Sequence, residues 1–195
     1  MHTVDSTTVL AFWFGEPIQT PSYAERRSLW FGKDPDLDRE IGDRFLGTYR
    51  QAAAGELDHW QQTPFDCLAL VIVLDQFSRN LFRQQAQAFA ADSKALSIAQ
   101  GAIAQGFDQQ LHPVHRIFLY LPLEHSEDRA IQQESVALFQ RLAEAYPELN
   151  DTYDYALRHQ QVIEQFGRFP HRNVALGRES TLEEQEFLKQ PGSSF

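Results

Sequence analysis

The sequence predicts an all-α protein, because helix start and stop residues recur along its whole length and no segment keeps the apolar-polar alternation of a half-buried strand. The predicted loops are short, and short loops make consecutive helices antiparallel neighbours. We therefore expect about nine helices packed as antiparallel pairs. With 195 residues, the chain is long enough for one sizeable core. We expect a single helical domain over residues 1–189 and a frayed tail over residues 190–195.

The first three helices are marked by glycines, a proline and a capping residue. They are expected over residues 6–14, 23–31 and 35–54. Gly15, Gly32 and Gly55 follow them directly, as expected for residues that end a helix. Asp34 and Pro35 suit the N-cap and the first position of the third helix. The apolar residues of that helix recur every four positions, which predicts one buried face.

The next helix begins at Pro64, after Thr63, and is apolar on nearly every side through Leu74. A helix without a polar face belongs in the core, so we expect this one to be the central helix. It contains Cys67, the only cysteine, which we interpret as a buried thiol with no disulfide partner in the chain. The polar residues 75–80 that follow are expected to emerge from the core.

Five further helices are expected, each marked by a capping residue or a proline. They run from Asp92 to Gly106, Pro113 to Tyr120, Ser126 to Ala145 and Asp151 to Phe166, with a last short helix after Thr181. We expect Ser126 to cap its helix, and Glu127 and Asp128 to complement the helix dipole. Thr181 and Glu184 have the spacing of a capping box. The residues expected to be almost fully buried are Leu70, Leu74, Phe77, Ile103, Leu119, Phe139 and Phe166.

The net charge of −10 argues against partners that require a basic surface overall, while leaving room for a local basic site. Proteins that bind nucleic acid or anionic lipid through bulk electrostatics carry an excess of Lys and Arg, so we expect neither partner. The longest apolar run has eight residues, whereas a helix that spans a membrane needs about 20. The N-terminus carries Asp5 and lacks a basic region followed by a long apolar stretch. A cytoplasmic location is therefore expected.

Four blocks of sequence carry a family resemblance. They read VLAFWFG at residues 9–15, LDQFSRN at 74–80, LPLEHSED at 121–128 and FGRFPHRN at 166–173. In this order, they resemble the bacterial domain-of-unknown-function family nine hundred and twenty-four. The resemblance implies a tetratricopeptide-like fold, a right-handed array of stacked antiparallel helix pairs. It implies no activity, so candidate site residues must be chosen from their chemistry.

The second and fourth blocks, with the residues just after the second, supply candidates for binding an anion. These candidates are Arg79, Asn80, Arg83, Arg168, Arg172 and Asn173. Guanidinium groups bind carboxylates and phosphates through paired hydrogen bonds. The fourth block is expected to be a loop, since Gly167 ends a helix and Pro170 disfavours helical backbone before it. The alternative is that the arginines form internal ion pairs, as Asp75 and Arg79 would four residues apart on a helix.

His125 and His171 are candidates for proton transfer, and Asp75 is a third candidate catalytic residue. The alternative for His125 is that it only packs beside a helix start. No metal site is expected, because the His and Glu spacings do not match a zinc or carboxylate-bridged site. No cofactor is expected either, since no glycine-rich phosphate loop, dinucleotide fingerprint or nucleophile elbow occurs.

Two functions follow from these candidates. The first is a binding scaffold for an acidic peptide or a small anion, with Arg79, Arg83, Arg168 and Arg172 in the site. The second is an enzyme that acts on a phosphorylated or carboxylated metabolite, with His125 or His171 as the proton carrier. We predict that the blocks around Asp75, His125 and Arg168 meet in space. A closed pocket would favour the enzyme, and an open groove would favour a peptide. The sequence gives no oligomeric state.

Overall fold

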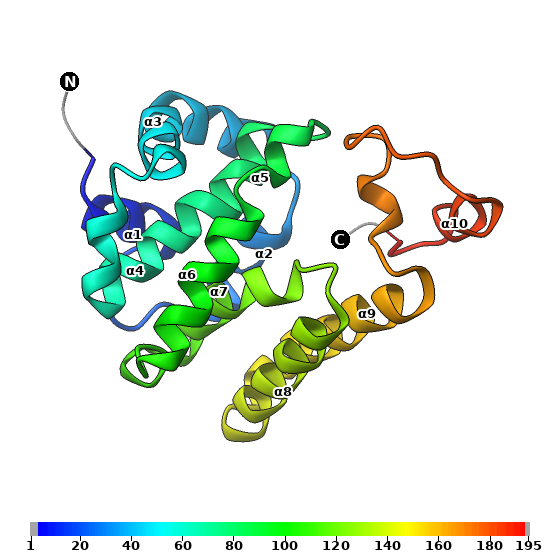
Figure 1. Ribbon diagram of the computed structural model, residues 1–195. Helices are drawn as coiled ribbons and strands as arrows, with labels where there is room; N and C mark the ends of the chain where they lie inside the picture. The colour runs from blue at the N-terminus through cyan, green and yellow to red at the C-terminus, as the bar shows by residue number, and fades with distance from the viewer. Residues whose placement is uncertain (1–3, 194–195) are drawn as a thin grey trace.

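The computed structural model describes residues 4–193, and this range contains helices and turns but no strand (Figure 1). The α-helices are α1 (Ser6–Phe14), α2 (Tyr23–Phe31), α3 (Pro35–Ala54), α4 (Pro64–Val71), α5 (Ser78–Leu81), α6 (Asp92–Ala104), α7 (Pro113–Glu124), α8 (Arg129–Ala145), α9 (Asn150–Phe166) and α10 (Leu182–Phe187). The π-helical stretch Ile72–Phe77 joins α4 to α5, so the two are parts of one continuous helix. With that helix counted once, the described residues form nine helices besides short 3-10 turns. The predicted all-α fold is confirmed.

The continuous helix from α4 to α5 is the centre of the core. Every side chain of residues 67–78 is buried, and α1, α3, α6 and α7 pack around the helix. The prediction of a central helix is therefore correct, but its polar end stays in the core through Ser78, and only Arg79 and Asn80 of the residues expected to emerge are partly exposed. Asp75, Gln76 and Ser78 are buried as well. Their polar groups are hydrogen-bonded within the protein, which offsets the cost of burying them.

The starts of α3, α4 and α10 follow the predicted capping residues. Asp34 accepts hydrogen bonds from the backbone N–H groups of Asp36 and Leu37, and Thr63 accepts one from Asp66. The predicted capping box is present at the start of α10. These acceptors satisfy N–H groups that the first helical turn leaves unpaired.

Two caps differ from the prediction. Asp92 does not cap α6, because its carboxylate binds the guanidinium of Arg79 instead. The N-cap of α8 is Asp128 and not Ser126. The Asp128 carboxylate accepts a hydrogen bond from the N–H of Ala130 at 2.8 Å, so the helix begins later than predicted.

α7 is longer than the sequence indicates. The predicted end is Tyr120, but the helix continues through Pro122 to Glu124. A proline within a helix removes the hydrogen bond to the carbonyl four residues before it, here that of Phe118. The helix is buried at this point, and its packing holds it in place. The extra turn carries Glu124 and His125 into the interior.

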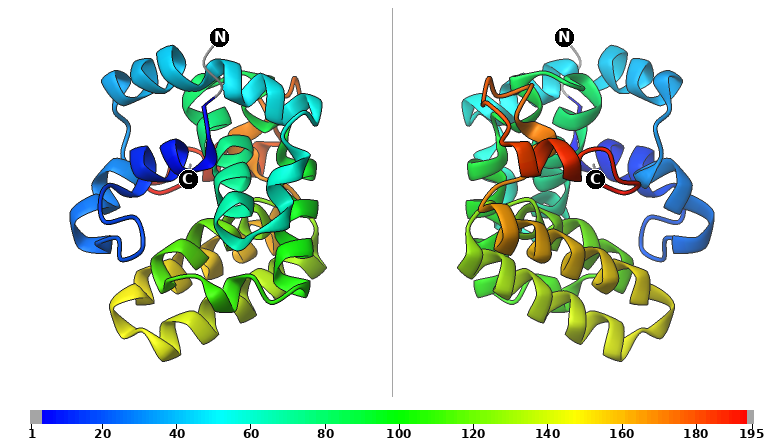
Figure 2. Two further views of the ribbon diagram at one scale, coloured as in Figure 1. Left: turned by 90° about the vertical axis from the view of Figure 1, so that its left-hand side faces the viewer. Right: turned by 90° about the vertical axis from the view of Figure 1, so that its right-hand side faces the viewer.

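α8 and α9 form an antiparallel pair along one edge of the molecule, and α7 packs against α8 (Figure 1). Both views in Figure 2 place α3 and the α8–α9 pair at opposite ends of the molecule. Antiparallel packing is thus present between α8 and α9, which the short segment 146–149 joins. The right-handed, tetratricopeptide-like order of the pairs stays a prediction.

The core contains five of the seven residues expected in it, namely Leu70, Leu74, Phe77, Leu119 and Phe139. Ile103 and Phe166 are only half-buried. Ile103 lies near the end of α6, where the helix leaves the core. Phe166 packs against Phe187 of α10, with 5.1 Å between ring centroids, in a separate small cluster.

That small cluster is where the segment after α9 folds back onto it. Phe169 is fully buried there against Val162 and Ile163 of α9. Near the end of the segment, the buried Ser193 hydroxyl donates a hydrogen bond to the carbonyl of Leu188 at 3.1 Å. Residues 194 and 195 of the predicted frayed tail lie outside the described residues.

Candidate functional site

A cavity of about 590 Å³ lies where α2, the central helix, α7 and α9 meet the segment after α9. The 3-10 turn Ala86–Phe89 also lines it. Phe31 and Tyr155 line the cavity while being 46% and 40% exposed, so it opens to solvent beside them. Its volume is in the range of pockets that hold small molecules.

The π-helical stretch places Asp75 behind this cavity. Asp75 is fully buried, and His125 and Gln76 contact its carboxylate through nitrogens at 2.8 and 2.6 Å. A nitrogen of Arg79 lies 3.2 Å from the same carboxylate. Burial alone would raise the pKa of Asp75, but the charges of Arg79 and His125, with these hydrogen bonds, hold it below its usual range. Asp75 is therefore a buried anion at neutral pH.

Asp75 and His125 form a carboxylate-imidazole dyad. A carboxylate only accepts hydrogen bonds, so the 2.8 Å contact requires the proton of neutral His125 to be on Nδ1. Burial, and then the charge of Arg79, lower the pKa of His125, while Asp75 opposes them. His125 lines the cavity, and its Nε2 has no hydrogen bond to any part of the chain that the structure describes. That nitrogen is available to accept a proton.

A second carboxylate-imidazole pair lies beside the first, and the sequence did not reveal it. Glu124 Oε1 is 3.0 Å from Nδ1 of His159, and both side chains are buried. The rings of His159 and His125 are 6.2 Å apart between centroids. Glu124 immediately precedes His125 in the third sequence block, and this position was the signal by which the sequence could have indicated Glu124 as a site residue. Nothing in the sequence around His159 marks it as part of a site.

Two arginines share the carboxylate of Asp92, which the sequence had assigned to a helix cap. Arg79 binds it with two hydrogen bonds of 3.0 Å. Arg172 reaches it with one hydrogen bond of 3.4 Å. The Arg172 guanidinium lies between the rings of Phe89 and Phe169, at 4.7 and 4.5 Å from their centroids. Arg172 lines the cavity and is only 6% exposed.

The charge of Arg172 is poorly compensated. A guanidinium has five N–H groups, and that single long bond is the one hydrogen bond that Arg172 makes to described side chains or backbone through its side chain. Its buried Nε has no partner there. Burial, followed by repulsion from Arg79, lowers the pKa of Arg172 to about 10, although Asp92 opposes this. Arg172 therefore remains a cation at neutral pH with donors to spare.

The structure brings together five of the residues that the sequence nominated, namely Asp75, Arg79, His125, His171 and Arg172. His171 lines the cavity, and its ring lies 5.6 Å from that of Phe169. Burial, and then the charge of Arg172, lower its pKa to about 3. His171 is thus a neutral and weakly basic imidazole, unlike the proton carrier proposed for it.

Asn80 and Arg83 also line the cavity, but their polar groups face another partner. Both bind the carboxylate of Asp38 on α3, at 2.7 Å from the Asn80 amide and 2.8 Å from Nη2 of Arg83. The sequence pattern of α3 shows Asp38 as an ordinary surface residue. These contacts tie α5 to α3 at the edge of the cavity.

The blocks around Asp75, His125 and Arg168 meet at the cavity as predicted, but Arg168 itself and Asn173 do not line it. Arg168 binds the Glu184 carboxylate through Nε and Nη2 at 2.7 and 2.8 Å. The Asn173 amide donates to the same carboxylate at 3.2 Å. Glu184, the second residue of the capping box, draws both side chains away from the cavity. They hold the C-terminal segment in place.

The cavity wall is cationic although the chain is acidic. Five cationic side chains and two carboxylates line it, an excess of three positive charges, whereas the whole chain carries −10. The lining cations are Arg27, Lys33, Arg79, Arg83 and Arg172. Asp38, Asp75 and Asp92 pair with three of them but do not line the cavity. These three carboxylates thus lie behind the cations in an outer layer, whereas Glu124 and Asp151 line the cavity together with the cations.

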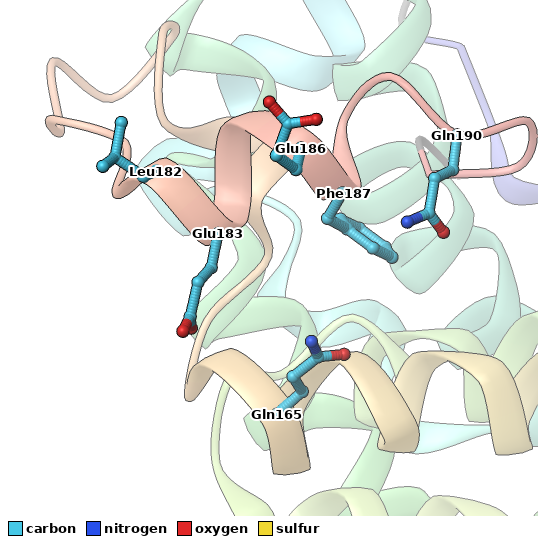
Figure 3. Close-up of a pocket in the computed structure, with 6 residues that line it drawn as sticks. All are labelled: Gln165, Leu182, Glu183, Glu186, Phe187 and Gln190. Carbon is cyan, nitrogen blue, oxygen red and sulfur yellow. The ribbon is translucent and has the colours of Figure 1, made fainter.

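A second hollow, of about 480 Å³, lies between the end of α9 and α10 (Figure 3). Its lining contains Glu183 and Glu186 but no cation or histidine. Figure 3 shows these two carboxylates pointing in different directions from α10. Its polar groups do not converge on a common point, so the cavity around Arg172 is the better candidate site.

No group of three or more His, Cys, Asp or Glu side chains among residues 4–193 has the geometry to hold a metal ion. No helix in that range is both long and apolar enough to cross a membrane.

Comparison with known proteins places the chain among bacterial proteins. The family model described as bacterial protein of unknown function (DUF924) matches residues 9–192. A solved structure of a protein of unknown function from Agrobacterium tumefaciens is 38% identical, with a TM-score of 0.82. The match covers 94% of this chain and 96% of that one. A comparison with curated proteins found no match.

Proposed function

This chain belongs to the DUF924 family of bacterial proteins of unknown function, and we propose that it binds a small organic anion in the cavity around Arg172. The observation that carries the proposal is the guanidinium of Arg172, which is buried, charged and bound by one hydrogen bond of 3.4 Å. A buried charge with unsatisfied donors is costly unless a partner completes it. A carboxylate or phosphate in the cavity would supply that partner through paired hydrogen bonds.

The shape of the cavity favours a small molecule over an acidic peptide. A peptide would need a long groove, whereas this cavity has a volume of about 590 Å³ and lies between packed helices. Its inner layer of cations and outer layer of carboxylates also favours an anion that enters fully. An acidic peptide that touched only the rim would leave the remaining donors of Arg172 without a partner.

A thermal-shift screen tests this proposal directly. Organic phosphates, carboxylates and acidic peptides would be added to the wild type, to Arg172→Met and to Arg168→Lys. A ligand at 100 times its dissociation constant adds about 2.7 kcal/mol of stability, or about 5 to 10 °C for a chain of this size. We expect shifts with small anions that disappear in Arg172→Met and persist in Arg168→Lys. An equal shift in Arg172→Met would show that the anion binds elsewhere.

The Asp75–His125 dyad favours a second candidate function, an enzyme that moves a proton on the bound anion. His125 Nδ1 is fixed by Asp75 at 2.8 Å, and Nε2 is left for a substrate in the cavity. π-helical turns, such as the one that carries Asp75, are frequent at functional sites. His125, and not His171, would be the proton carrier, because the pKa of His171 is about 3.

Incubation with a bacterial small-molecule extract, followed by mass spectrometry, tests the enzymatic candidate. The comparison is between the wild type and His125→Gln, which replaces the imidazole with an amide that can form hydrogen bonds but cannot exchange the proton. We expect compounds that the wild type consumes and that His125→Gln binds without consuming. If no compound changes, or if both proteins change it equally, His125 is not a catalytic residue.

A further inference from the structure

The walls of the cavity narrow the class of anion, and this step rests on the proposed function. We infer that the ligand is an aryl carboxylate, that is, a single carboxylate attached to a body that contains an aromatic ring. Three features of the cavity lead to this class. They are its local charge balance, the aromatic character of its walls and the geometry around Arg172.

The charge balance favours a ligand with one negative charge. The cations that line the cavity are Arg27, Lys33, Arg79, Arg83 and Arg172, and the carboxylates that line it or pair with these cations are Asp38, Asp75, Asp92, Glu124 and Asp151. The two sets have equal and opposite charge. Among the four lining arginines, Arg27, Arg79 and Arg83 each hold a carboxylate closely, whereas Arg172 reaches Asp92 only at 3.4 Å. One negative charge of a ligand is therefore matched at Arg172, and the second charge of a phosphate monoester would find no such weakly paired guanidinium.

The walls favour a ligand with an apolar ring. Trp30, Phe31, Phe89 and Tyr155 are among the aromatic side chains that line the cavity. Phe31 and Tyr155 belong to the small set of large apolar side chains that are exposed within residues 4–193. Exposed apolar surface gathered at a cavity commonly marks a ligand site. An acetate-sized anion would leave this surface in contact with water, while an aromatic body would cover it.

The surroundings of Arg172 favour a planar carboxylate. The rings of Phe89 and Phe169 lie 4.7 and 4.5 Å from its guanidinium carbon, and the N–H groups that can donate to a ligand lie along the edge of the guanidinium. A carboxylate lies in the plane of that edge and accepts two parallel hydrogen bonds. Phe89 also lines the cavity, so it can contact a ring attached to the bound carboxylate.

Isothermal titration calorimetry with matched probes tests the inference. The aryl carboxylates are benzoate, phenylacetate, phenylpropionate and indole-3-acetate. Each is compared with its primary amide, which removes the charge. The acids that carry a phenyl ring are also compared with their cyclohexyl analogues, which remove the aromaticity. Acetate and benzyl phosphate complete the set. We expect at least one aryl carboxylate to bind. Its amide and acetate should bind with affinities lower by about tenfold or more. Its cyclohexyl analogue should bind with an affinity lower by about threefold or more.

Two variants tie the result to the cavity. Tyr155→Ser removes an exposed ring from its wall and should weaken the aryl carboxylate about tenfold. Leu182→Ser removes an exposed apolar side chain on α10, outside the cavity, and should leave the affinity unchanged. Equal weakening in both variants would overturn the assignment of the ring to this wall.

The outcomes separate this inference from the proposed function. If benzyl phosphate, other organic phosphates or aliphatic acids bind in an Arg172-dependent way and no aryl carboxylate does, the inference is overturned while the anion-binding proposal stands. If a cyclohexyl acid binds as well as its aryl counterpart, the requirement for an aromatic ring is overturned. If no anion of any class binds, both proposals fail.

Discussion

His115 is a histidine that the fold keeps neutral. Its side chain is fully buried, with Nε2 2.9 Å from the carbonyl oxygen of Ile18, so Nε2 carries the proton. Its ring lies 4.6 Å from that of Phe14, and its Nδ1 has no partner within the described residues. Burial, and then the charge of His112, lower the pKa of His115 from 6.5 to about 4.

This lowered pKa predicts a loss of stability in mild acid. Between pH 6.5 and about 4, the unfolded state binds a proton at His115 that the folded state refuses, so the free energy of unfolding falls as pH falls. The contribution is at most about 1.4 kcal/mol per pH unit. The whole contribution of His115 to the free energy of unfolding is present above pH 6.5, where its ring is neutral in both the folded and the unfolded state. In urea denaturation at a series of pH values across this range, the free energy of unfolding of His115→Phe should fall less steeply with falling pH than that of the wild type. The difference should be up to about 1.4 kcal/mol per pH unit.

The exposed imidazole of His59 provides the control for this experiment. His59→Gln should keep the slope of the wild type. If His115→Phe also keeps it, the His115 ring is protonated in the folded protein, and the burial described for it is wrong.

Single residues show how far the sequence predicts the candidate site. The residue types at Asp75, His125 and Arg172 indicated buried polar chemistry, and the structure places His125 and Arg172 in the cavity wall with Asp75 directly behind His125. Arg168 had the same chemical character, but Glu184 binds it elsewhere. A sequence shows that a charged side chain needs a partner, but the choice among carboxylates depends on three-dimensional positions. Asp92 illustrates the same point, since it was a capping residue by pattern and is an ion-pair partner in space.

Among the elements, the central helix should dominate stability. Leu74 lies in its π-helical stretch and is fully buried. Leu74→Ala should lower the free energy of unfolding by roughly 2 to 5 kcal/mol, because it leaves a cavity in tightly packed surroundings. Leu182→Ala, at a residue that is 79% exposed on α10, is the control and should change it by less than about 0.5 kcal/mol. A loss below about 1 kcal/mol for Leu74→Ala would show that the helix is not central.

The C-terminal segment depends on a few polar contacts to stay docked. The Glu184 carboxylate accepts hydrogen bonds from Arg168, from Asn173 and from the backbone N–H of Thr181. The hydrogen bonds and charge of Arg168, together with the Thr181 bond, lower the pKa of Glu184 to about 2, so the side chain is ionised at neutral pH. Glu184→Gln should therefore loosen this segment and speed trypsin cleavage at Arg178.

Glu186→Gln changes an exposed carboxylate on the same helix and should leave the cleavage rate unchanged. Equal rates in Glu184→Gln and the wild type would mean that the apolar contacts of Phe166 and Phe169 suffice to hold the segment. In that case, the carboxylate of Glu184 has little part in docking it.

Helix boundaries were predictable wherever a local signal sets them. Asp34 and Thr63 cap α3 and α4, because a side-chain oxygen before a helix can satisfy free N–H groups without help from the rest of the fold. The extra turn of α7 beyond Pro122 could not be predicted in this way, because packing overrides the local preference of proline. The π-helical turn around Asp75 likewise has no sequence signature of its own.

Over the whole molecule, Cys67 reports on global unfolding. Its thiol is 2% exposed, and burial, followed by the charge of Asp66, raises its pKa to about 11. The reactive thiolate is therefore scarce at neutral pH and also shielded. Labelling with a thiol reagent should be slow in the native state and should speed up with urea as steeply as global unfolding does. Rapid labelling with little dependence on urea would reveal a local opening of α4.

The arrangement of the whole molecule was less predictable than its parts. The number of helices and the central position of one of them followed from apolar patterns. The cavity did not, because its walls come from residues around 23–33, 76–89, 117–125 and 151–175, which no local pattern connects. His159 makes the point, since it joins the site only because α9 packs beside the end of α7.

The layered charge around the cavity has a consequence for how fast an anion could reach it. Paired cations and carboxylates cancel at a distance, so beyond a Debye length of about 8 Å an approaching anion meets mainly the field of a chain that carries −10. Attraction begins only inside the opening. Added salt screens the outer repulsion more than the contacts within, so the association rate constant should rise with ionic strength, the reverse of electrostatically steered binding. The site would then select its ligand after entry rather than by capture from solution.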